Sequence, residues 1–365
     1  MALKCGIVGL PNVGKSTLFN ALTSAKALAA NYPFATKEPN VGVITVPDLR
    51  LDKLAELVNP QKVIPTTVDI VDIAGLIKGA SKGEGLGNQF LGNIRETDAI
   101  VHVVRCFDDD NVVHVDGSVD PVRDKMIIDT ELIFKDIETI EKRADKVRRT
   151  AKSGNKEHVK LVELYDGLLA HLNQEKPARS FEVSEEDQPL IDELYLLTAK
   201  PILYVCNVDE DSFPDGNQHT KAFRAAVADE NAEILLVSAQ IEAEIAELDT
   251  AEDRQEFLED MGLEEPGVNR VIRASYSLLK LLTYFTAGEK EVRAWTITEG
   301  TKAPGAAGVI HTDFEKGFIR AEVIHYADYV EYGSEAGARD AGKLNVEGKE
   351  YVVEDGDVMH FRFNV

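Results

Sequence analysis

Cysteine is scarce in this chain of 365 residues, which contains only three, at positions 5, 106 and 206. An odd number with such wide spacing excludes a disulfide framework and a paired zinc module. Each cysteine lies in an apolar run typical of a buried strand. We therefore expect reduced cysteines in the core of a cytosolic protein.

Positive charge is also in short supply, since 40 lysines and arginines face 64 aspartates and glutamates, for a formal net charge of −24. Such an acidic chain does not bind nucleic acid or anionic membranes indiscriminately. Any contact with RNA must therefore come from a local basic patch.

Long hydrophobic runs are absent as well. No apolar stretch approaches the roughly 20 residues that span a bilayer, and glycine and proline interrupt the first one. The apolar fraction of 44% and the charged fraction of 28% are typical of globular domains. We expect a soluble, cytoplasmic and monomeric protein without a membrane contact.

Apolar runs without clean alternation, separated by helical patterns, predict a doubly wound α/β sheet. In such a sheet, ligands bind at the carboxyl ends of the strands. The predicted strands cover residues 3–8, 41–46, 68–74, 99–107, 200–208 and 233–239.

A long helical pattern separates the predicted strands 99–107 and 200–208. Apolar residues spaced by three and four run from Ile133 to Ala151, a turn follows at 153–155, and the rhythm continues from Leu161 to Leu172. This pattern predicts an antiparallel coiled coil, inserted at about residues 130–198.

The tip of this coiled coil is basic, because residues 142–160 contain eight lysines and arginines and only two acidic residues. One interpretation is an ordinary solvated helix face. The other is an arm that contacts the phosphates of RNA. The candidate contact residues are Lys142, Arg143, Arg148, Arg149 and Lys152.

The last part of the chain has short strand-like runs, turns rich in Gly and Asp, and a short helix near 308–316. This pattern predicts a small mixed α+β domain at residues 281–365, after a nucleotide-binding domain at 1–280. Its predicted strands cover residues 290–298, 319–326, 349–353 and 358–365.

The strongest signal is GLPNVGKS at residues 9–16, which follows a strand, precedes a helix and matches the phosphate-binding pattern G-x-x-x-x-G-K-[ST]. The two glycines let the backbone turn its N–H groups towards phosphates, and the helix adds its positive end. Lys15 would neutralise the β- and γ-phosphates and so act in catalysis, while Ser16 would ligate Mg²⁺. The predicted nucleotide-binding residues of this loop are Asn12, Val13, Gly14, Lys15, Ser16 and Thr17.

Two further Mg²⁺ ligands follow in the order of switch nucleotide hydrolases. Thr36 could close on Mg²⁺ and the γ-phosphate, and Asp72 of the element DIAG would hold the ion through water. The N–H of Gly75 would sense the γ-phosphate. The glycine-dense stretch 79–92 should be flexible and become ordered in one nucleotide state.

Leu76 follows DIAG, where many switch GTPases have a glutamine that orients the attacking water. An aliphatic side chain cannot do this, so hydrolysis is slow or another group acts. His114, in a polar loop after a predicted strand, is the candidate catalytic residue, because a neutral imidazole can accept a hydrogen bond from water. The alternative is a surface-loop histidine without a role. His102, within a strand, is assigned to the core.

Base recognition differs from the N-K-x-D pattern of guanine binders. In the stretch from Asn207 through Val208 to Glu210, the acid at the fourth position is one methylene longer, and Asp209 is out of register. Loss of the bidentate contact to guanine should cost GTP about 1–3 kcal/mol, which favours ATP. Asn207 could still reach the exocyclic amine or N7. The loop predicted to line the base consists of Ser238, Ala239 and Gln240.

Several long strings in one order make the chain resemble the YchF-type Obg-like ATPase family over essentially its whole length. The strings are GIVGLPNVGKSTLFNALT at 6–23, DIAGLIKGASKGEGLGNQFL at 72–91, NVDE at 207–210, EEPGVNRVIRASY at 264–276, YFTAGEKEVRAWT at 284–296 and HTDFEKGFIRAEV at 311–323.

The resemblance implies an Obg-type nucleotide domain with a coiled-coil insertion and a C-terminal TGS domain of β-grasp form. It implies ATP rather than GTP, and the ribosome, as its large subunit or the whole 70S particle, as partner. It also implies Mg²⁺ at Ser16 and Thr36, a water-positioning histidine at His114, and K⁺ at Asn12. Lys37 departs from the apolar residue expected beside Thr36.

Together these features predict a ribosome-associated, Mg²⁺-dependent ATP hydrolase that acts as a slow molecular switch in translation or stress regulation. A GTPase of the Obg type is the first alternative. The second is a nucleotide-gated ribosome-binding adaptor with incidental hydrolysis, which Leu76 favours. Ribosomes would stimulate the turnover of a switch, whereas an adaptor would bind them without stimulation.

Overall fold

The computed structural model describes residues 3–24, 40–73, 86–151 and 156–364. The chain forms two compact units. The first consists of residues 1–42 and 69–271, and the second of residues 43–68 and 272–365. Each unit is described by itself below.

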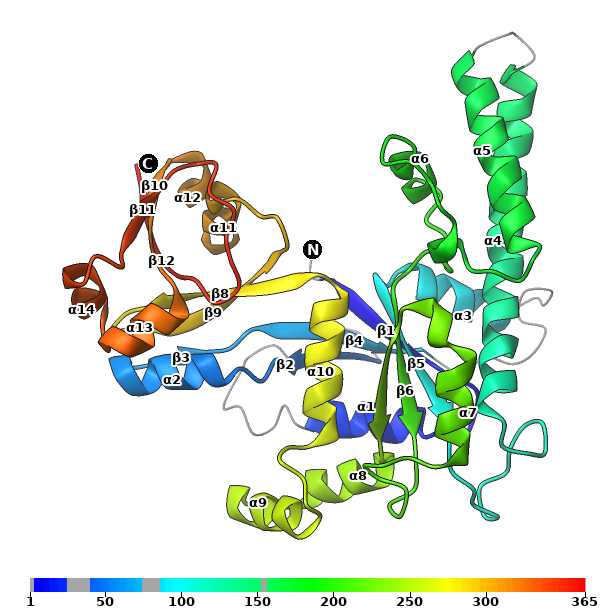
Figure 1. The fold of residues 1–365 in the computed structure, drawn as a ribbon, viewed down its shortest axis with the longest axis horizontal. Helices are drawn as coiled ribbons and strands as arrows, with labels where there is room; N and C mark the ends of the chain where they lie inside the picture. Colours follow the sequence, from blue (N-terminus) through cyan, green and yellow to red (C-terminus); the bar gives the residue numbers. More distant parts are fainter. Residues whose placement is uncertain (1–2, 25–39, 74–85, 152–155, 365) are drawn as a thin grey trace. The chain divides into compact units, whose positions relative to one another are not determined.

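A six-stranded sheet, whose residues belong to the first unit except for residues 43–45 of β2 and 67–68 of β4, is the frame of the nucleotide-binding part (Figure 1). Its strands are β1 (Lys4–Val8), β2 (Val41–Thr45), β4 (Thr67–Asp72), β5 (Ala99–Arg105), β6 (Ile202–Asn207) and β7 (Glu233–Val237). Their order is β2-β4-β1-β5-β6-β7, and the neighbours from β4 to β7 pair in parallel. β5 and β6 are buried along their whole length, which explains why their sequences are continuous apolar runs. The predicted α/β sheet and its six strands are confirmed.

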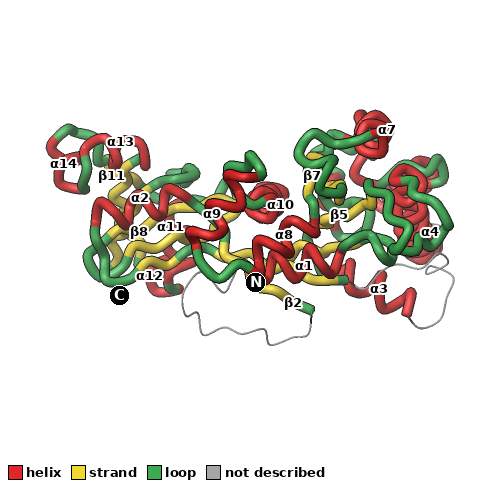
Figure 2. The backbone as a smooth tube through the Cα atoms, turned by 90° about the horizontal axis from the view of Figure 1, so that it is seen from below, coloured by secondary structure: helices red, strands yellow, loops and turns green. Residues whose placement is uncertain are grey.

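The helices of the nucleotide-binding part outside the coiled-coil hairpin are α1 (Lys15–Ser24), α3 (Leu86–Arg95), α6 (Gln188–Asp192), α7 (Gln218–Ala226), α8 (Ala239–Glu247), α9 (Ala251–Asp260) and α10 (Gly267–Leu278), with 3-10 turns η2 (Ala178–Ser180) and η3 (Ala228–Glu230). α10 starts in the first unit and ends in the second. α1 and α8 lie side by side (Figures 1 and 2). They begin directly after the phosphate-binding loop and after β7, so both helix N-termini follow the carboxyl end of a strand.

The predicted helical hairpin consists of α4 (Pro121–Ala151) and α5 (Lys156–Leu172) (Figure 1). The two helices pack side by side and only four residues join them, so they run antiparallel. The apolar positions that the spacing selected are buried together and confirm the coiled-coil pattern. They include Ile133, Ile140, Ala144, Tyr165, Leu168 and Leu172.

α4 begins at residue 121 and not near the expected boundary at 130. The carboxylate of Asp120 accepts hydrogen bonds from the N–H groups of Val122 and Arg123, and Pro121 occupies the first helical position. Both features favour a helix start, because they satisfy N–H groups that have no partner within the helix. The helix therefore extends from the nucleotide-binding unit into the hairpin without a break.

The second unit is built on a mixed six-stranded sheet. Its strands are β3 (Val63–Ile64), β8 (Leu281–Ala287), β9 (Val292–Thr298), β10 (Phe318–Ile324), β11 (Asn345–Glu347) and β12 (Val358–Phe363), in the order β11-β10-β12-β8-β9-β3. β8 and β12 form a parallel pair at its centre, and each has an antiparallel neighbour on its other side. A C-terminal α+β domain, as expected, is therefore present.

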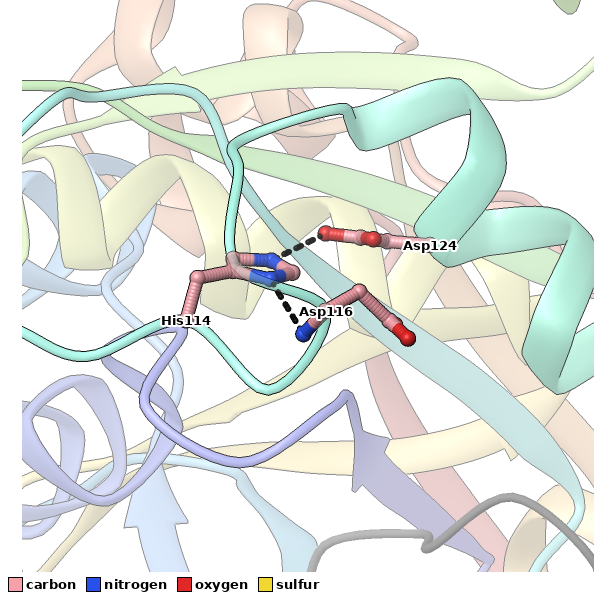
Figure 3. A group of neighbouring side chains, drawn as sticks. All are labelled: His114, Asp116 and Asp124. Atoms are coloured by element: carbon pink, nitrogen blue, oxygen red, sulfur yellow. Dashed lines mark hydrogen bonds and ion pairs between the residues drawn. The ribbon is translucent and has the colours of Figure 1, made fainter.

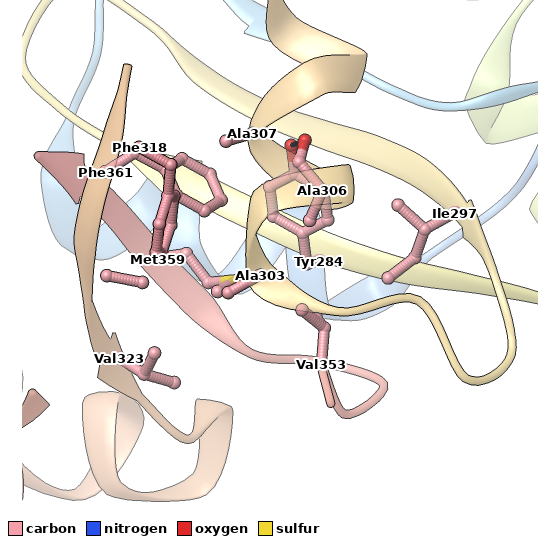
Figure 4. Packing of buried hydrophobic residues seen from close by; sticks show 11 residues of the cluster. Tyr284, Ile297, Ala303, Ala306, Ala307, Phe318, Val323, Val353, Met359 and Phe361 are labelled. Atoms are coloured by element: carbon pink, nitrogen blue, oxygen red, sulfur yellow. Dashed lines mark hydrogen bonds between the residues drawn. The ribbon is translucent and has the colours of Figure 1, made fainter. Parts of the chain in front are cut away.

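Helices pack on both the sheet and the loops of this unit. They are α2 (Leu49–Val58), α11 (Ala303–Ile310), α12 (Thr312–Lys316), α13 (Tyr326–Tyr332) and α14 (Glu335–Asp340). Small side chains of α11 let it approach the sheet closely, beside Phe361 and Met359 of β12 (Figure 4). The hydroxyl of Tyr284 donates to the carbonyl of Ala306 at 2.9 Å, which satisfies the one polar atom that this tyrosine brings into the core.

Two expectations for this region were wrong. Residues 43–68 belong to the second unit and not to the nucleotide-binding unit. The reason is that α2 buries Leu51 and Leu54 in a cluster with residues of β8 and β9, and β3 pairs with β9. Residues 349–353 are a turn with one isolated bridge, and the short strand β11 lies just before them.

All three cysteines are buried and free, as expected. In the described part of the chain, no helix combines the length and the apolar character that crossing a membrane requires.

Candidate functional site

Five strand ends meet at one edge of the first sheet. Because β4, β1, β5, β6 and β7 run in parallel, their carboxyl ends lie at the same edge. The segments singled out in the sequence follow these ends: the loop 9–14 after β1, Asp72 at the end of β4, the loop with His114 after β5, Asn207 at the end of β6, and Ser238 after β7. Motifs that are far apart in the sequence therefore lie along one edge of the sheet.

The phosphate-binding loop has the backbone that its glycines were expected to allow. Gly14 has a φ of 90°, and a Cβ added there would lie 2.1 Å from Nδ2 of Asn207. Gly9 is equally confined, since its Cβ would lie 2.7 Å from the carbonyl oxygen of Val103. α1 begins at Lys15, so the free N–H groups of its first turn adjoin the loop. This loop can bind an anion.

Lys15 and Asp72 form an ion pair, with Nζ and Oδ1 2.5 Å apart, and Lys15 is buried. The pair brings the predicted phosphate ligand and the predicted Mg²⁺ ligand together across β1 and β4. Ser16 is exposed in the first turn of α1, where its hydroxyl can meet a bound ion. Hydroxyl and carboxylate oxygens are the ligands that Mg²⁺ prefers, so the described residues fit this ion. Thr36, Gly75 and Leu76 lie outside the described residues.

Asn207 makes two hydrogen bonds within the protein, in addition to the contact with the base that the sequence predicts. Its Nδ2 donates to the carbonyl of Val13 at 2.9 Å, and its Oδ1 accepts from the N–H of Ala239 at 2.9 Å. The side chain is buried and ties the phosphate-binding loop to the loop after β7. One hydrogen of Nδ2 and one lone pair of Oδ1 remain for a base, so Asn207 braces the site and keeps limited capacity for a further contact.

The three residues after Asn207 differ in how far they are exposed, and Asp209 is half-buried. Glu210 is exposed, whereas Val208 is buried and its N–H donates to Val237. The carboxylate of Asp209 accepts from the N–H of Ser212 at 2.8 Å and so closes a turn. This contact accounts for an acid that was out of register in the guanine-binding pattern.

The loop predicted to line the base begins with a helix cap. Ser238 is buried and its hydroxyl accepts from the N–H of Ile241 at the start of α8, while Gln240 is exposed. Ala239 is held through the contact of its N–H with Asn207. The segment 238–240 is thereby fixed at the edge of the sheet beside the phosphate-binding loop.

His114 is buried, and both nitrogens of its ring are bound (Figure 3). Nε2 lies 2.8 Å from Oδ2 of Asp124, and Nδ1 accepts from the N–H of Asp116 at 3.1 Å. The sequence predicts that His114 can accept a hydrogen bond from water, and in this arrangement both ring nitrogens are occupied by other partners. The loop itself is where it was expected, because Nδ2 of Asn12 donates to the carbonyl of Val113 at 3.0 Å.

Sequence reasoning missed Arg105, which shapes the His114 loop. Its buried guanidinium donates to the carbonyls of Phe107, Asp109 and Val112, at 3.1, 3.2 and 2.8 Å. It also stacks on the ring of Phe107. A charge within a continuous apolar strand was the available signal, because a buried guanidinium requires several acceptors.

The basic tip of the hairpin contains two kinds of cation. Lys142 pairs with Glu138, and Arg148 pairs with Asp145 and Asp166, all within the hairpin. The exposed side chains of Arg143 and Arg149 have no ion pair among the described residues. Lys152 lies outside the described residues. The charge available to an external anion is therefore smaller than the sequence count indicates.

Family models match most of the chain in two parts. A model described as a 50S ribosome-binding GTPase matches residues 4–138. A second, for the C-terminal part of YchF GTPases and described as a protein of unknown function, matches residues 281–364.

Curated relatives match over the full length. The ribosome-binding ATPase YchF of Bacillus subtilis is 59% identical over 367 residues, with 100% of both chains covered. The proteins of the same name from Haemophilus influenzae and Escherichia coli O157:H7 are 57% and 56% identical, again over 100% of both chains. A solved structure described as the YchF GTPase of Schizosaccharomyces pombe has a TM-score of 0.90 at 41% identity, covering 99% of this chain and 97% of that chain.

Proposed function

The chain belongs to the YchF family, which makes it a nucleotide hydrolase with a phosphate-binding loop, and from this we propose that it is a ribosome-associated ATPase that works as a slow, Mg²⁺-dependent switch. The observation that supports the proposal most strongly is the network at the sheet edge, where Lys15 contacts Asp72 and Asn207 braces the phosphate-binding loop. We further propose that it acts in the cytoplasm as a monomer, in translation or stress regulation.

We assign the phosphates to the loop 9–17 and its helix. Lys15 would exchange its ion pair with Asp72 for the β- and γ-phosphates, which would free the carboxylate to serve as a metal ligand. Ser16, Asp72 and Thr36 would hold Mg²⁺, which would supply positive charge against the phosphates. Asn12 uses Nδ2 on Val113, and its side-chain oxygen is the atom we propose as a K⁺ ligand.

We assign the attacking water to His114. Nδ1 has to leave the N–H of Asp116 before it can accept from water, and the ring is held in place by its second contact, with Asp124. This requirement gives a physical reason for slow turnover in isolation, because only molecules with a released histidine react. Typical unassisted switches hydrolyse at about 10⁻⁴–10⁻² per second.

We propose that the base site selects adenine. The carboxylate that reads guanine in N-K-x-D proteins is replaced by an exposed Glu210, and Asp209 is engaged with Ser212. Adenine has an acceptor where guanine has a ring N–H, so the lack of a facing carboxylate removes a repulsion. The named relatives do not agree on this point, since some are called ATPases and one a GTPase.

We propose that the basic tip contacts ribosomal RNA. Replacing Arg143 and Arg149 together by glutamine is expected to weaken ribosome binding about three- to tenfold and to reduce the salt dependence, because two cations free of ion pairs are lost. Co-sedimentation at several salt concentrations measures both effects. ATP turnover without ribosomes should not change.

The matched control replaces the two paired cations, Lys142 and Arg148, by glutamine. Because both already interact with carboxylates of the hairpin, this variant should lose less affinity than the first. Equal binding of wild type and both variants at every salt concentration would return the tip to the interpretation of a solvated face.

A binding adaptor with incidental hydrolysis is the second candidate function, and the bound state of both His114 nitrogens favours it. The two functions differ in one measurement, which is ATP turnover with and without saturating ribosomes. A switch should be stimulated severalfold, whereas an adaptor should bind at an unchanged rate of hydrolysis.

A further inference from the structure

The two bonds of the His114 ring define its protonation. Nδ1 accepts from the N–H of Asp116, so the proton of the neutral ring is on Nε2 and is donated to Asp124 (Figure 3). In this arrangement neither nitrogen can accept a hydrogen bond from water. Nδ1 can accept from water only when the ring turns away from Asp116, and the contact of Nε2 with Asp124 holds the ring against that movement. This contact is therefore a restraint on the catalytic role assigned to His114.

The burial pattern around His114 is inverted. The histidine is 9% exposed, whereas its neighbours Val113 and Val115 are 74% and 54% exposed. A loop that turned its polar residue outwards and its two valines inwards would gain the burial of apolar surface. Something must therefore stabilise the present arrangement against that alternative.

Asp124 is the group in the right place to do so. It is 2% exposed, its Oδ2 accepts from His114 at 2.8 Å, and its Oδ1 accepts from the guanidinium of Arg123 at 2.8 and 3.1 Å. The guanidinium of Arg123 and the ring of His114 thus share one buried carboxylate. His114 thus adds a side-chain contact with α4 to the backbone contacts by which Asn12, Arg105 and Arg123 hold this loop.

Asp124 also lies in the first turn of α4, the helix that ends at the basic tip. Near the middle of α4, the fully buried Asp136 accepts from the N–H groups of Leu197 and Thr198 at 2.7 and 2.8 Å. Twelve residues separate it from Asp124 and twelve from Arg148, about 18 Å on each side at 1.5 Å per residue. A helix anchored at its centre moves its two ends in opposite directions when it tilts.

We propose that Asp124 is a latch that retains His114 away from the attacking water, and that α4, tilting about its anchor at Asp136, opens this latch when RNA binds the basic tip. The inference rests on the proposed function and adds its regulation. Asp124 is a positioning residue, since it acts through His114. Lys125 of the same turn pairs with Glu230 at 2.6 Å and defines the resting position of this helix end.

The substitution Asp124→Asn tests the latch, because the amide keeps the shape and a neutral acceptor but loses the charge. Basal turnover of ATP should rise about five- to tenfold, with KM unchanged within a factor of two. The rise should vanish in the double variant Asp124→Asn/His114→Ala, and ribosomes should stimulate Asp124→Asn much less than wild type. Asp110→Asn, which removes a charge from an exposed position of the same loop, is the matched control and should behave as wild type.

Three readings of these assays contradict the latch. A fall in kcat of Asp124→Asn at unchanged thermal stability would mean that Asp124 supports the histidine. A rise that persists without His114 would mean that it acts elsewhere. If ribosomes stimulated the already faster Asp124→Asn variant as strongly as wild type, the latch would not respond to RNA binding at the tip. A wild type whose turnover is independent of His114 would instead refute the proposed function, so the two failures are distinguishable.

Discussion

Alanine in place of His114 is expected to lower the turnover of ATP about 100-fold or more, while the affinity for ATP changes less than about threefold. General acid–base and water-orienting groups contribute about 10²–10⁴ in rate, whereas the phosphate-binding loop supplies the affinity. The side chain contacts Asp124 and the backbone of Asp116, and no phosphate-binding residue among those described. Single-turnover hydrolysis and nucleotide displacement separate the two quantities.

His219→Ala is the control for this experiment. This histidine contacts the exposed Asp108, which lies in the same loop as His114, at 3.0 Å. It therefore touches the loop at a different residue from the one assigned to catalysis. Its loss should leave turnover close to the wild-type value. Equal losses of turnover and affinity in His114→Ala would show that the histidine holds the site together and does not act on water.

Alanine in place of Asn207 should lower both stability and nucleotide affinity. The substitution leaves the carbonyl of Val13 and the N–H of Ala239 without their partner in a buried environment. Two such groups cost about 2–5 kcal/mol in the free energy of unfolding. Because the phosphate-binding loop is released at the same time, the affinity for ATP should fall at least tenfold. Urea unfolding and nucleotide displacement measure the two effects.

Asn173→Ala provides the comparison, since this exposed asparagine bonds only to a carbonyl of its own helix, at 2.7 Å. It should change stability by less than about 0.5 kcal/mol. An Asn207→Ala variant with wild-type stability but reduced affinity would restore the direct contact with the base as the main role of Asn207.

Much of the frame could be predicted because its signals are local. A run such as residues 99–105 is apolar throughout since both faces of β5 are covered, and the hairpin repeats its apolar residues every three or four positions. The phosphate-binding loop needs glycine at a φ of 90°, which leaves a trace in the sequence. Each of these features depends on neighbours within a few residues.

The features that could not be predicted depend on partners far away in the chain. The two leucines of α2 signal an amphipathic helix, but nothing in residues 49–58 says that their partners are Phe285 and Val292. The same holds for Asn207, whose partners are 194 and 32 residues away, and for Asp124, which reads as an ordinary acid in a first helical turn. Hydrogen bonds between residues so far apart in the chain change the role of a residue without changing the local sequence pattern.

Competition between ATP and GTP tests most directly whether this site hydrolyses ATP. A fluorescent nucleotide bound in the presence of Mg²⁺ and K⁺ is displaced by each triphosphate, and hydrolysis of each is followed in parallel. We expect ATP to bind about tenfold or more tightly than GTP and to be the nucleotide that is turned over, because Asp209 is engaged with Ser212 and the acid at the fourth position is the longer Glu210. Tighter binding of GTP, with faster hydrolysis, would contradict the account and show that Asp209 or Glu210 reads guanine after all.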